Sequence, residues 1–144
     1  MLGKNDYIRK AHGPAVEDIE IVDQLREVLV VEESDNYCIY SEADRSELLF
    51  ALFQLVAVGG HLNQYEDYLG PYRDATRELY KLLVNVRKDP SNDQMFVDTQ
   101  CYSIKAIDGK PVFPEDHPQN RYMVIVQPFT KICIILRHRW QYFS

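Results

Sequence analysis

The pattern of apolar residues predicts one helix at the centre of the fold. Residues 48–58 read Leu-Leu-Phe-Ala-Leu-Phe-Gln-Leu-Val-Ala-Val, so apolar side chains would cover nearly every face of a helix there. Ser41 is suited to the N-cap, because its hydroxyl can accept a hydrogen bond from a backbone N–H of the first turn. Gly59-Gly60 has the permissive backbone that ends a helix. We therefore expect a core helix from Ser41 to Val58, covered on several sides.

A second, amphipathic helix is predicted between Pro71 and Lys88. The fixed φ angle of Pro71 suits a first helical turn, and Pro90 prevents the helix from continuing. Apolar residues recur at intervals of three and four, at Tyr72, Ala75, Leu79, Leu82, Leu83 and Val86. The other face is charged and carries the i,i+3 pairs Asp74–Arg77 and Glu78–Lys81. A short polar elbow, residues 59–70, joins the two helices.

The segment before the core helix is predicted to contain an arm and a further helix. Residues 1–15 are polar and mixed, and Gly13-Pro14 would end any regular structure, so we interpret them as a flexible arm. From Glu17 to Leu29 apolar side chains fall on one side of a helix and charged ones on the other. Residues 30–40 leave extended structure and a turn open, because β-formers at both ends flank a polar stretch.

After Pro90 the pattern becomes typical of strands. Residues 95–107 are rich in β-branched and aromatic residues, and a shift in their apolar alternation suggests a bulge near Cys101. Asp108-Gly109 is a hairpin signal, followed by a short return strand and an irregular loop over residues 113–120. Two further strands, Arg121–Val126 and Lys131–Trp140, are almost continuously apolar, which predicts that they are buried with one face against the core helix.

Helices followed by strands predict an α+β fold. The N-terminal core helix and amphipathic helix would pack on a C-terminal antiparallel β-meander. The chain has 144 residues, of which 46% are hydrophobic, so residues 16–144 are expected to form a single domain with one sizeable core.

Composition excludes several functional classes. The net charge of −6 argues against a general nucleic-acid binder, and the sequence has no apolar run of membrane-spanning length and no signal peptide. Cys38, Cys101 and Cys133 are widely separated, odd in number and surrounded mostly by apolar residues. They are predicted to be reduced core thiols without a disulfide, in a soluble intracellular protein.

Few residues are candidates for catalysis or ligand binding, and each of them also has a structural explanation. Glu66 and Asp67 resemble an acid/base pair, but adjacent residues rarely converge on one substrate atom, which favours a structural elbow or a partner-binding surface. The histidines lack companions at ligand spacing, so no metal or cofactor is expected. Gly59-Gly60 ends a helix instead of opening one, unlike a phosphate loop. The basic, aromatic segment 137–140 is interpreted as a solvated strand end, with binding of RNA or an acidic protein as the alternative.

The elbow and the helix after it also resemble a known family. Gly-Gly-x-x-x-Gln-Tyr-Glu-Asp at 59–67, Pro-Tyr at 71–72 and Val-x-Val-Arg-Lys-x-Pro at 84–90 are similar, without gaps, to the C-terminal half of the cilia- and flagella-associated protein 300 family. The likeness runs from about residue 6 to residue 88. Members of that family are longer, so the resemblance implies that residues 1–15 are the cut end of an interdomain connection.

The resemblance implies a non-enzymatic ciliary or flagellar protein. It would act as an adaptor in the assembly and transport of axonemal outer and inner dynein arms, and be needed for axoneme organisation and motility. The implied location is the cytoplasm and the axoneme of a motile cilium or flagellum. The implied partners are a kintoun-type dynein assembly factor and the intraflagellar transport machinery, with dynein arm subunits as further candidates and with no nucleic acid or membrane.

On this basis we expect the elbow to form or support a protein-contact surface. The candidate residues are Gln64, Tyr65, Glu66, Asp67, Tyr68 and Tyr72. Tyrosine favours this role, since it combines a large contact area with a polar group. Two alternatives stay open. One is a structural axonemal component that binds tubulin or doublet proteins, and the other is an enzyme acting on a small molecule or nucleotide, with its site at residues 64–67 of the elbow and at the sheet tip.

Overall fold

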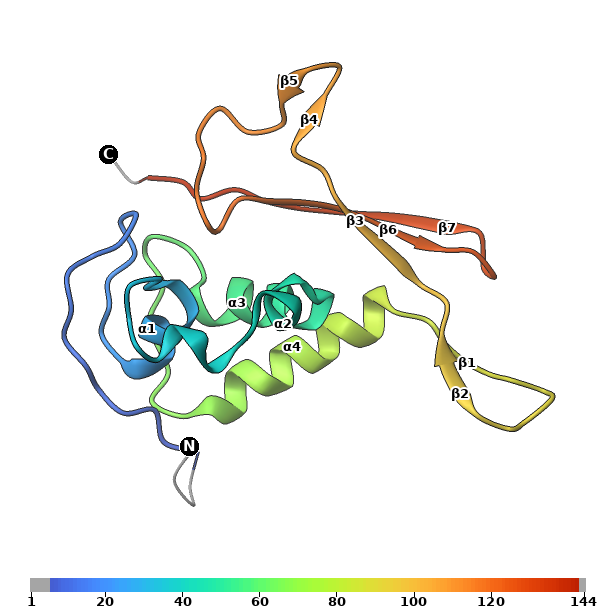
Figure 1. Ribbon diagram of the computed structural model, residues 1–144, viewed down its shortest axis with the longest axis horizontal. Coiled ribbons are helices and arrows are strands. Elements are labelled where there is room, and N and C mark those ends of the chain that lie inside the picture. Colours follow the sequence, from blue (N-terminus) through green and yellow to red (C-terminus); the bar gives the residue numbers. More distant parts are fainter. Residues whose placement is uncertain (1–5, 143–144) are drawn as a thin grey trace.

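The computed structural model describes residues 6–142 and confirms the predicted α+β class, with helices in the first half and antiparallel strands in the second (Figure 1). The helices are α1 (Gln24–Val30), the 3₁₀ turn η1 (Tyr37–Ile39), α2 (Glu42–Ser46), α3 (Leu48–Val58) and α4 (Leu69–Leu83). The strands are β1 (Val86–Lys88), β2 (Met95–Val97), β3 (Gln100–Ser103), β4 (Ala106–Ile107), β5 (Lys110–Pro111), β6 (Arg121–Gln127) and β7 (Ile132–His138). No helix in the described range has the length and apolar composition needed to cross a membrane.

The helix α3 is the core helix, because it contributes to both hydrophobic clusters of the fold. At its C-terminal end, Val58 packs with residues of α1 and with Ile8 and Ile19. Nearer its start, Leu52 packs with the β6 residue Ile125, and both are fully buried. Truncating such a buried leucine to alanine typically costs about 2–5 kcal/mol. The prediction of a core helix covered on several sides is therefore confirmed, except at Leu49, which is 51% exposed.

The predicted N-cap at Ser41 is confirmed, but the helix that it starts is short. The Ser41 side chain accepts a hydrogen bond from the backbone N–H of Asp44, and the Asp44 carboxylate accepts one from the Ser41 backbone. The expected continuous helix to Val58 is wrong, because the backbone becomes extended at Glu47 and separates α2 from α3. The cause is tertiary: the Arg45 guanidinium, 3.5 Å from the Tyr37 ring, donates to carbonyl oxygens at the end of α1 and of Tyr37.

The helix predicted from Glu17 to Leu29 is only half formed. Glu17 and Asp18 have positive φ angles of 47° and 62°, which a right-handed helix does not allow, and the turn that they form buries Ile19. The helix α1 starts after Asp23, whose side chain accepts from the backbone N–H of Arg26. Between α1 and α2 the chain forms a turn and η1, not a strand.

The second predicted helix is confirmed over most of its length, but its predicted end at Lys88 is wrong. Helix α4 ends at Leu83, and the residues after it form β1, paired antiparallel with β2. The buried side chain of Val84 and a hydrogen bond from the Asn85 backbone N–H to Thr99 Oγ1 turn the chain away from the helix axis. Leu82, expected on the apolar face, is 73% exposed.

One of the two ion pairs predicted on α4 is formed. Lys81 Nζ lies 3.1 Å from Glu78 Oε1, as the i,i+3 spacing predicts. Asp74 instead lies 4.0 Å from the guanidinium of its neighbour Arg73. Both contacts are solvent-exposed, so each contributes at most about 1 kcal/mol to stability.

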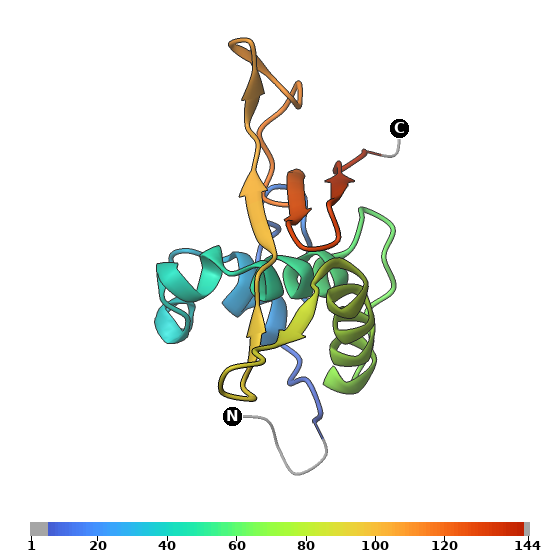
Figure 2. The same ribbon diagram turned by 90° about the vertical axis from the view of Figure 1, so that its right-hand side faces the viewer.

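The strands form three small antiparallel sheets. The largest has the order β3-β6-β7, while β1–β2 and β4–β5 are separate two-stranded ribbons. Figure 2 shows β2, β3 and β4 following one another along one path, with the two ribbons at its opposite ends. The predicted hairpin at Asp108-Gly109 is confirmed, with positive φ angles of 50° and 74°. The bulge predicted near Cys101 is wrong, since Cys101 pairs in regular register with Ile125 and the strand breaks fall on either side of β3.

Burial of the strands and of the cysteines differs from the prediction. One face of the sheet packs on α3 through Met123 and Ile125, as expected, but Ile135 on the opposite face of β7 is 60% exposed. The sheet has helices on one side only (Figure 1), so continuous apolar sequence does not mean burial on both faces.

The prediction of core thiols is wrong, because the three free cysteines, Cys38, Cys101 and Cys133, are exposed. Partial burial nevertheless raises the pKa of the Cys101 thiol.

The predicted solvated strand end at residues 137–140 is also wrong at its last residue. Trp140 is 2% exposed and stacks on the His117 ring, with centroids 4.5 Å apart. His117 Nε2 donates to the Glu17 carbonyl oxygen at 2.7 Å, and its Nδ1 accepts from the Gln119 backbone N–H. The loop of residues 113–120, confirmed as irregular, is thereby attached to the turn before α1.

Residues 6–13, which fall within the predicted arm, lie against the helical half. Ile8 is 3% exposed and belongs to the first hydrophobic cluster. Tyr7 forms an antiparallel bridge with Tyr68, and the Leu69 backbone N–H donates to the Asp6 carbonyl oxygen at 2.9 Å. Residues 1–5 of the predicted arm lie outside the described residues.

Candidate functional site

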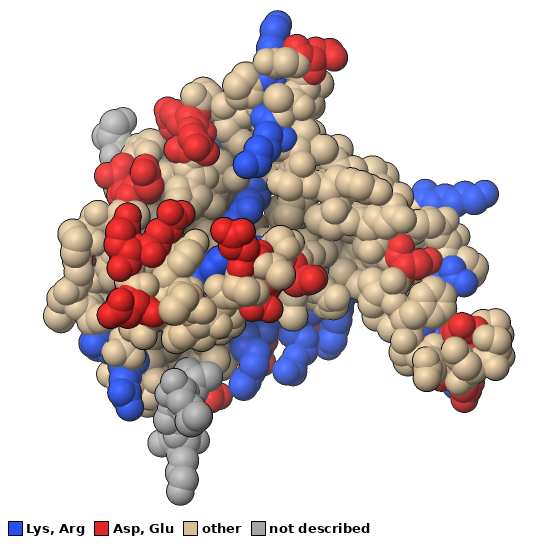
Figure 3. Space-filling model, viewed as in Figure 1, with Lys and Arg blue, Asp and Glu red and all other residues tan. Residues whose placement is uncertain are grey.

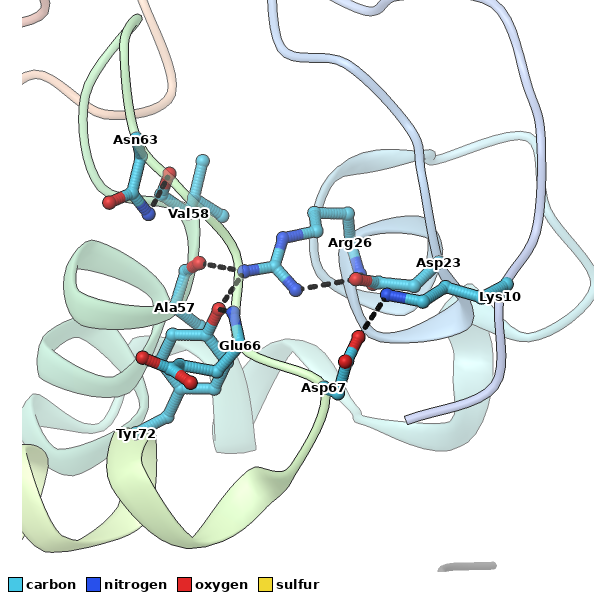
Figure 4. A network of polar contacts seen from close by, with 9 residues as sticks. All are labelled: Lys10, Asp23, Arg26, Ala57, Val58, Asn63, Glu66, Asp67 and Tyr72. Atoms are coloured by element: carbon cyan, nitrogen blue, oxygen red, sulfur yellow. Dashed lines mark hydrogen bonds and ion pairs between the residues drawn. The ribbon is translucent and has the colours of Figure 1, made fainter. Parts of the chain in front are cut away.

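The elbow between α3 and α4 is built around a buried arginine of α1. Arg26 has no solvent exposure, and Figure 4 shows its guanidinium between Asp23 and the ring of Tyr72. Its Nη1 atom lies 2.7 Å from Asp23 Oδ2, and Nη2 donates to Tyr72 Oη at 2.7 Å and to the carbonyl oxygen of Ala57. A buried charge is tolerated only when it is paired and hydrogen-bonded, so these contacts are what permit Arg26 in the core.

Two tyrosines of the elbow region complete the surroundings of Arg26. The guanidinium carbon lies 3.8 Å from the Tyr65 ring centroid and 5.1 Å from that of Tyr72, both within cation–π range. The Tyr72 hydroxyl oxygen also accepts a hydrogen bond from the Glu66 backbone N–H at 2.6 Å. Burial raises the pKa of the Tyr65 hydroxyl, partly offset by the positive charge of Arg26. One arginine therefore connects α1, the end of α3, the elbow and α4.

The outer side of the elbow is attached to the N-terminal segment. Lys10 Nζ lies 2.5 Å from Asp67 Oδ1, and the Ile8 backbone N–H donates to the Asp67 carbonyl oxygen at 2.9 Å. The hydrogen bond to Asp67 raises the pKa of the Lys10 ammonium. Arg73 lies 3.2 Å from Asp6 in the same region. These exposed ion pairs contribute little energy, so the backbone hydrogen bond and the burial of Ile8 hold this segment in place.

The structure divides the six predicted site residues into two groups. Tyr72 is 5% exposed and Tyr65 is half-buried, so their rings belong to the support of Arg26 and Tyr72 offers no contact surface. Gln64, Glu66, Asp67 and Tyr68 are exposed, and the Tyr68 ring packs edge-on against Tyr7 at 5.7 Å. The elbow thus combines a buried half that fixes the backbone with an exposed half that is acidic and aromatic.

Sequence reasoning missed Arg26 and Asp23. The spacing Asp-x-x-Arg is common on exposed helix faces, and Arg26 falls on the charged side of the predicted helix, so the sequence carries no signal that the pair is buried. The buried guanidinium of Arg26 is covered by segments distant in the sequence, which include Tyr65, Tyr72 and the Ala57 carbonyl.

The elbow carboxylates are not arranged as an acid/base pair. Figure 4 shows the Asp67 carboxylate directed at Lys10 and the Glu66 carboxylate on the side of Tyr72, so the two do not converge on one point. Among residues 6–142, no three His, Cys, Asp or Glu side chains gather closely enough to hold a metal ion. Exposed, diverging groups on a fixed backbone suit recognition of a partner better than chemistry on a bound substrate.

Comparisons with known proteins give one consistent result. Residues 1–138 match the family model described as cilia- and flagella-associated protein 300. The chain is 42% identical over 134 residues to the protein of that name from Paramecium tetraurelia, and 38% identical over 140 residues to the one from Chlamydomonas reinhardtii. These alignments cover 93% and 94% of this chain but 52% and 54% of the relatives, so it spans about half their length. No solved structure matches the chain.

Proposed function

This chain belongs to the cilia- and flagella-associated protein 300 family, and from that premise we propose that it acts as a non-enzymatic adaptor in the assembly and transport of axonemal outer and inner dynein arms. The association with cilia and flagella is that of the family. The adaptor role, the need for the protein in axoneme organisation and motility, and its work in the cytoplasm before transport to the axoneme are our proposal.

The observation that carries this proposal is the fixed and exposed elbow. Arg26 and Tyr72 hold its backbone, while Glu66 and Tyr68 face solvent. A surface whose backbone is already ordered loses little conformational entropy when a partner binds. An acidic and aromatic surface suits a protein segment with exposed basic side chains, since tyrosine gives contact area and a carboxylate pairs with Lys or Arg.

The partners in this proposal are proteins of the assembly route. They are a kintoun-type dynein assembly factor and the intraflagellar transport machinery, with dynein arm subunits as further candidates. Because the chain spans about half the length of its curated relatives, the elbow is proposed as one contact surface among those of a complete family member.

The experiment compares two charge reversals in a ciliated cell. Tagged wild-type chain, Glu66→Lys and the control Glu33→Lys are recovered from cytosol, and bound dynein arm subunits and assembly factors are quantified. Both glutamates are exposed, but only Glu66 belongs to the elbow. The proposal predicts about a tenfold loss of capture for Glu66→Lys, equivalent to one charge-assisted contact, and no loss for Glu33→Lys.

Two results would contradict this proposal. If both variants capture these proteins as well as wild type does, the elbow is not the contact surface. If the wild-type chain is absent from cytosolic assembly complexes and stays on salt-washed axonemes, the protein is a permanent axonemal component instead of an assembly adaptor.

A further inference from the structure

An apolar groove of about 630 Å³ lies between the α2–α3 segment and α4. Its apolar lining includes Leu49, Phe50 and Phe53 of α3 and Leu69 and Tyr80 of α4, with Tyr40 at one end. The groove is open to solvent: Leu49 is 51% exposed and Tyr40 is 41% exposed. It is separate from the elbow contacts of Arg26.

The break between α2 and α3 shapes this groove. The backbone is extended at Glu47, so α3 starts afresh at Leu48 and exposes Leu49 within its first turn. The ring of Phe50 lies edge-on to that of Tyr40 at 5.1 Å, which places an aromatic pair beside Leu49. An exposed leucine next to aromatic rings gives a partner both apolar area and shape to bind.

The two sides of the groove carry opposite charge. Asp44 and Glu47 line it on the side of α2, and Arg73 and Arg77 line it on the side of α4. Figure 3 shows acidic side chains gathered over α2 and basic ones along α4 below it. Within residues 6–142, neither Glu47 nor Arg77 forms an ion pair. Charges of both signs are therefore available to a bound partner.

We propose that the groove binds an amphipathic helix of a partner protein, with an apolar stripe facing Leu49, Phe50 and Phe53. One flank of that helix would be basic, against Asp44 and Glu47, and the other acidic, against Arg73 and Arg77. This inference rests on the proposed adaptor function, for which it supplies a second contact surface and the chemistry of its partner.

The opposite charges determine the direction in which the helix lies. Turning an amphipathic helix end for end exchanges its left and right flanks, so a basic flank can reach Glu47 in one orientation only. A helix with two basic or two acidic flanks repels one side of the groove in either orientation. Charge thus selects helices with unlike flanks and fixes their direction, while the apolar stripe supplies most of the affinity.

The test uses a designed, labelled helical peptide of about 18 residues, or five turns, with a leucine stripe, one Lys flank and one Glu flank. Binding is measured by fluorescence anisotropy against the wild-type chain, Leu49→Gln and the control Leu82→Gln. Leu82 is 73% exposed and lies outside the groove, so the control has the same change of polarity on the same fold. Circular dichroism checks that both variants are folded.

The proposal predicts saturable binding that Leu49→Gln weakens about tenfold, as expected for loss of a buried leucine contact, and that Leu82→Gln leaves unchanged. Peptides with two Lys flanks or two Glu flanks should bind about fivefold more weakly at low salt, with the difference reduced at high salt. In the double variant Glu47→Lys plus Arg77→Glu, Asp44 and Arg73 keep one charge of the original sign on each side of the groove, so the preference for the peptide with unlike flanks should disappear.

Three outcomes would overturn the inference. They are no saturable binding of the peptide with unlike flanks, equal weakening by Leu49→Gln and Leu82→Gln, and a dimer of the chain alone that Leu49→Gln dissociates, which would make the groove a contact between two copies. Failure here is distinguishable from failure of the adaptor proposal: if Leu49→Gln still captures dynein assembly proteins from cytosol as wild type does, only the groove inference is lost.

Discussion

The helical half and the two β-ribbons of this protein differ in how far their side chains are buried. In the helical half, even the charged pair Arg26 and Asp23 is fully buried and connects four segments. In the ribbons, every residue of β2, β4 and β5 is exposed. The difference teaches that long-range contacts determine the helical half, whereas local turn chemistry determines the ribbons. Matched substitutions in the two regions test this comparison.

The largest effect is expected from removing the buried arginine. Arg26→Met would leave the Asp23 carboxylate buried without its charge partner, and the Tyr72 hydroxyl and Ala57 carbonyl without a donor. Breaking a buried pair in this way costs about 3–5 kcal/mol, a large part of the 5–15 kcal/mol typical of a domain. Urea unfolding followed by circular dichroism measures it.

The double variant Arg26→Met plus Asp23→Asn serves as the control for that change. It keeps a side chain that can cap α1 but removes the unpaired charge, so it should be more stable than Arg26→Met alone. Equal stability of the two variants would mean that the buried ion pair is not what holds the elbow.

The pair Tyr72→Phe and Tyr102→Phe compares a buried hydroxyl group of the helical half with an exposed one in β3, the strand between the two ribbons. The Tyr72 hydroxyl accepts from Arg26 and from the Glu66 backbone, so its loss leaves buried donors unsatisfied and should cost about 1–3 kcal/mol. Tyr102 is 51% exposed and donates only to its near neighbour Gln100, so its change should stay within about 0.5 kcal/mol. Similar urea midpoints for both variants would contradict the comparison.

Gly59→Ala and Gly109→Ala compare two glycines with positive φ angles of 65° and 74°. Either alanine would strain the backbone by about 1 kcal/mol. At Gly59 a Cβ would in addition lie 2.5 Å from the Asn63 side chain, whereas at Gly109 nothing lies within 4 Å. The midpoint of thermal unfolding should fall clearly for Gly59→Ala. Gly109→Ala should only speed hydrogen exchange within the β4–β5 hairpin. If Gly109→Ala lowered the midpoint of thermal unfolding more than Gly59→Ala does, the comparison would be contradicted.

The smallest effects are expected at two serine–aspartate contacts, one in each half. Hydrogen bonds from the side chain and then the backbone of Ser41 lower the pKa of Asp44, and Ser91 does the same to Asp89 in the β1–β2 loop. A lowered folded-state pKa gives stability that is present at neutral pH and is lost as the pH falls through that value. The unfolded carboxyl begins to bind protons at about pH 5, so Ser41→Ala should flatten the acid dependence of the urea midpoint below that pH.

Ser91→Ala is the matched control for that measurement. It removes the same kind of hydrogen bond from a ribbon whose unfolding need not accompany global unfolding, so the global midpoint should change less than with Ser41→Ala. A larger change for Ser91→Ala would show that the ribbon is an integral part of the cooperative unit.

The candidate site was predictable only in part. The sequence indicates where the elbow lies, because Gly59 ends one helix and Pro71 belongs to the first turn of the next. It does not reveal which side of the elbow is exposed: Tyr68 and Tyr72 look alike in the sequence, yet one is 52% exposed and the other 5%. Helical spacing marks neighbours on one face but not the segment that will cover that face.

The sequence by itself determined the elements that depend on neighbouring residues. These are the cap at Ser41, the end of α3 at Gly59, the hairpin at Asp108-Gly109 and the α+β order, since each follows from backbone geometry or from a continuous apolar run. Tertiary structure alone decided the break at Glu47 and the burial of Arg26. Each of these depends on a partner distant in the sequence, whose contribution outweighs a local preference worth well under 1 kcal/mol per residue.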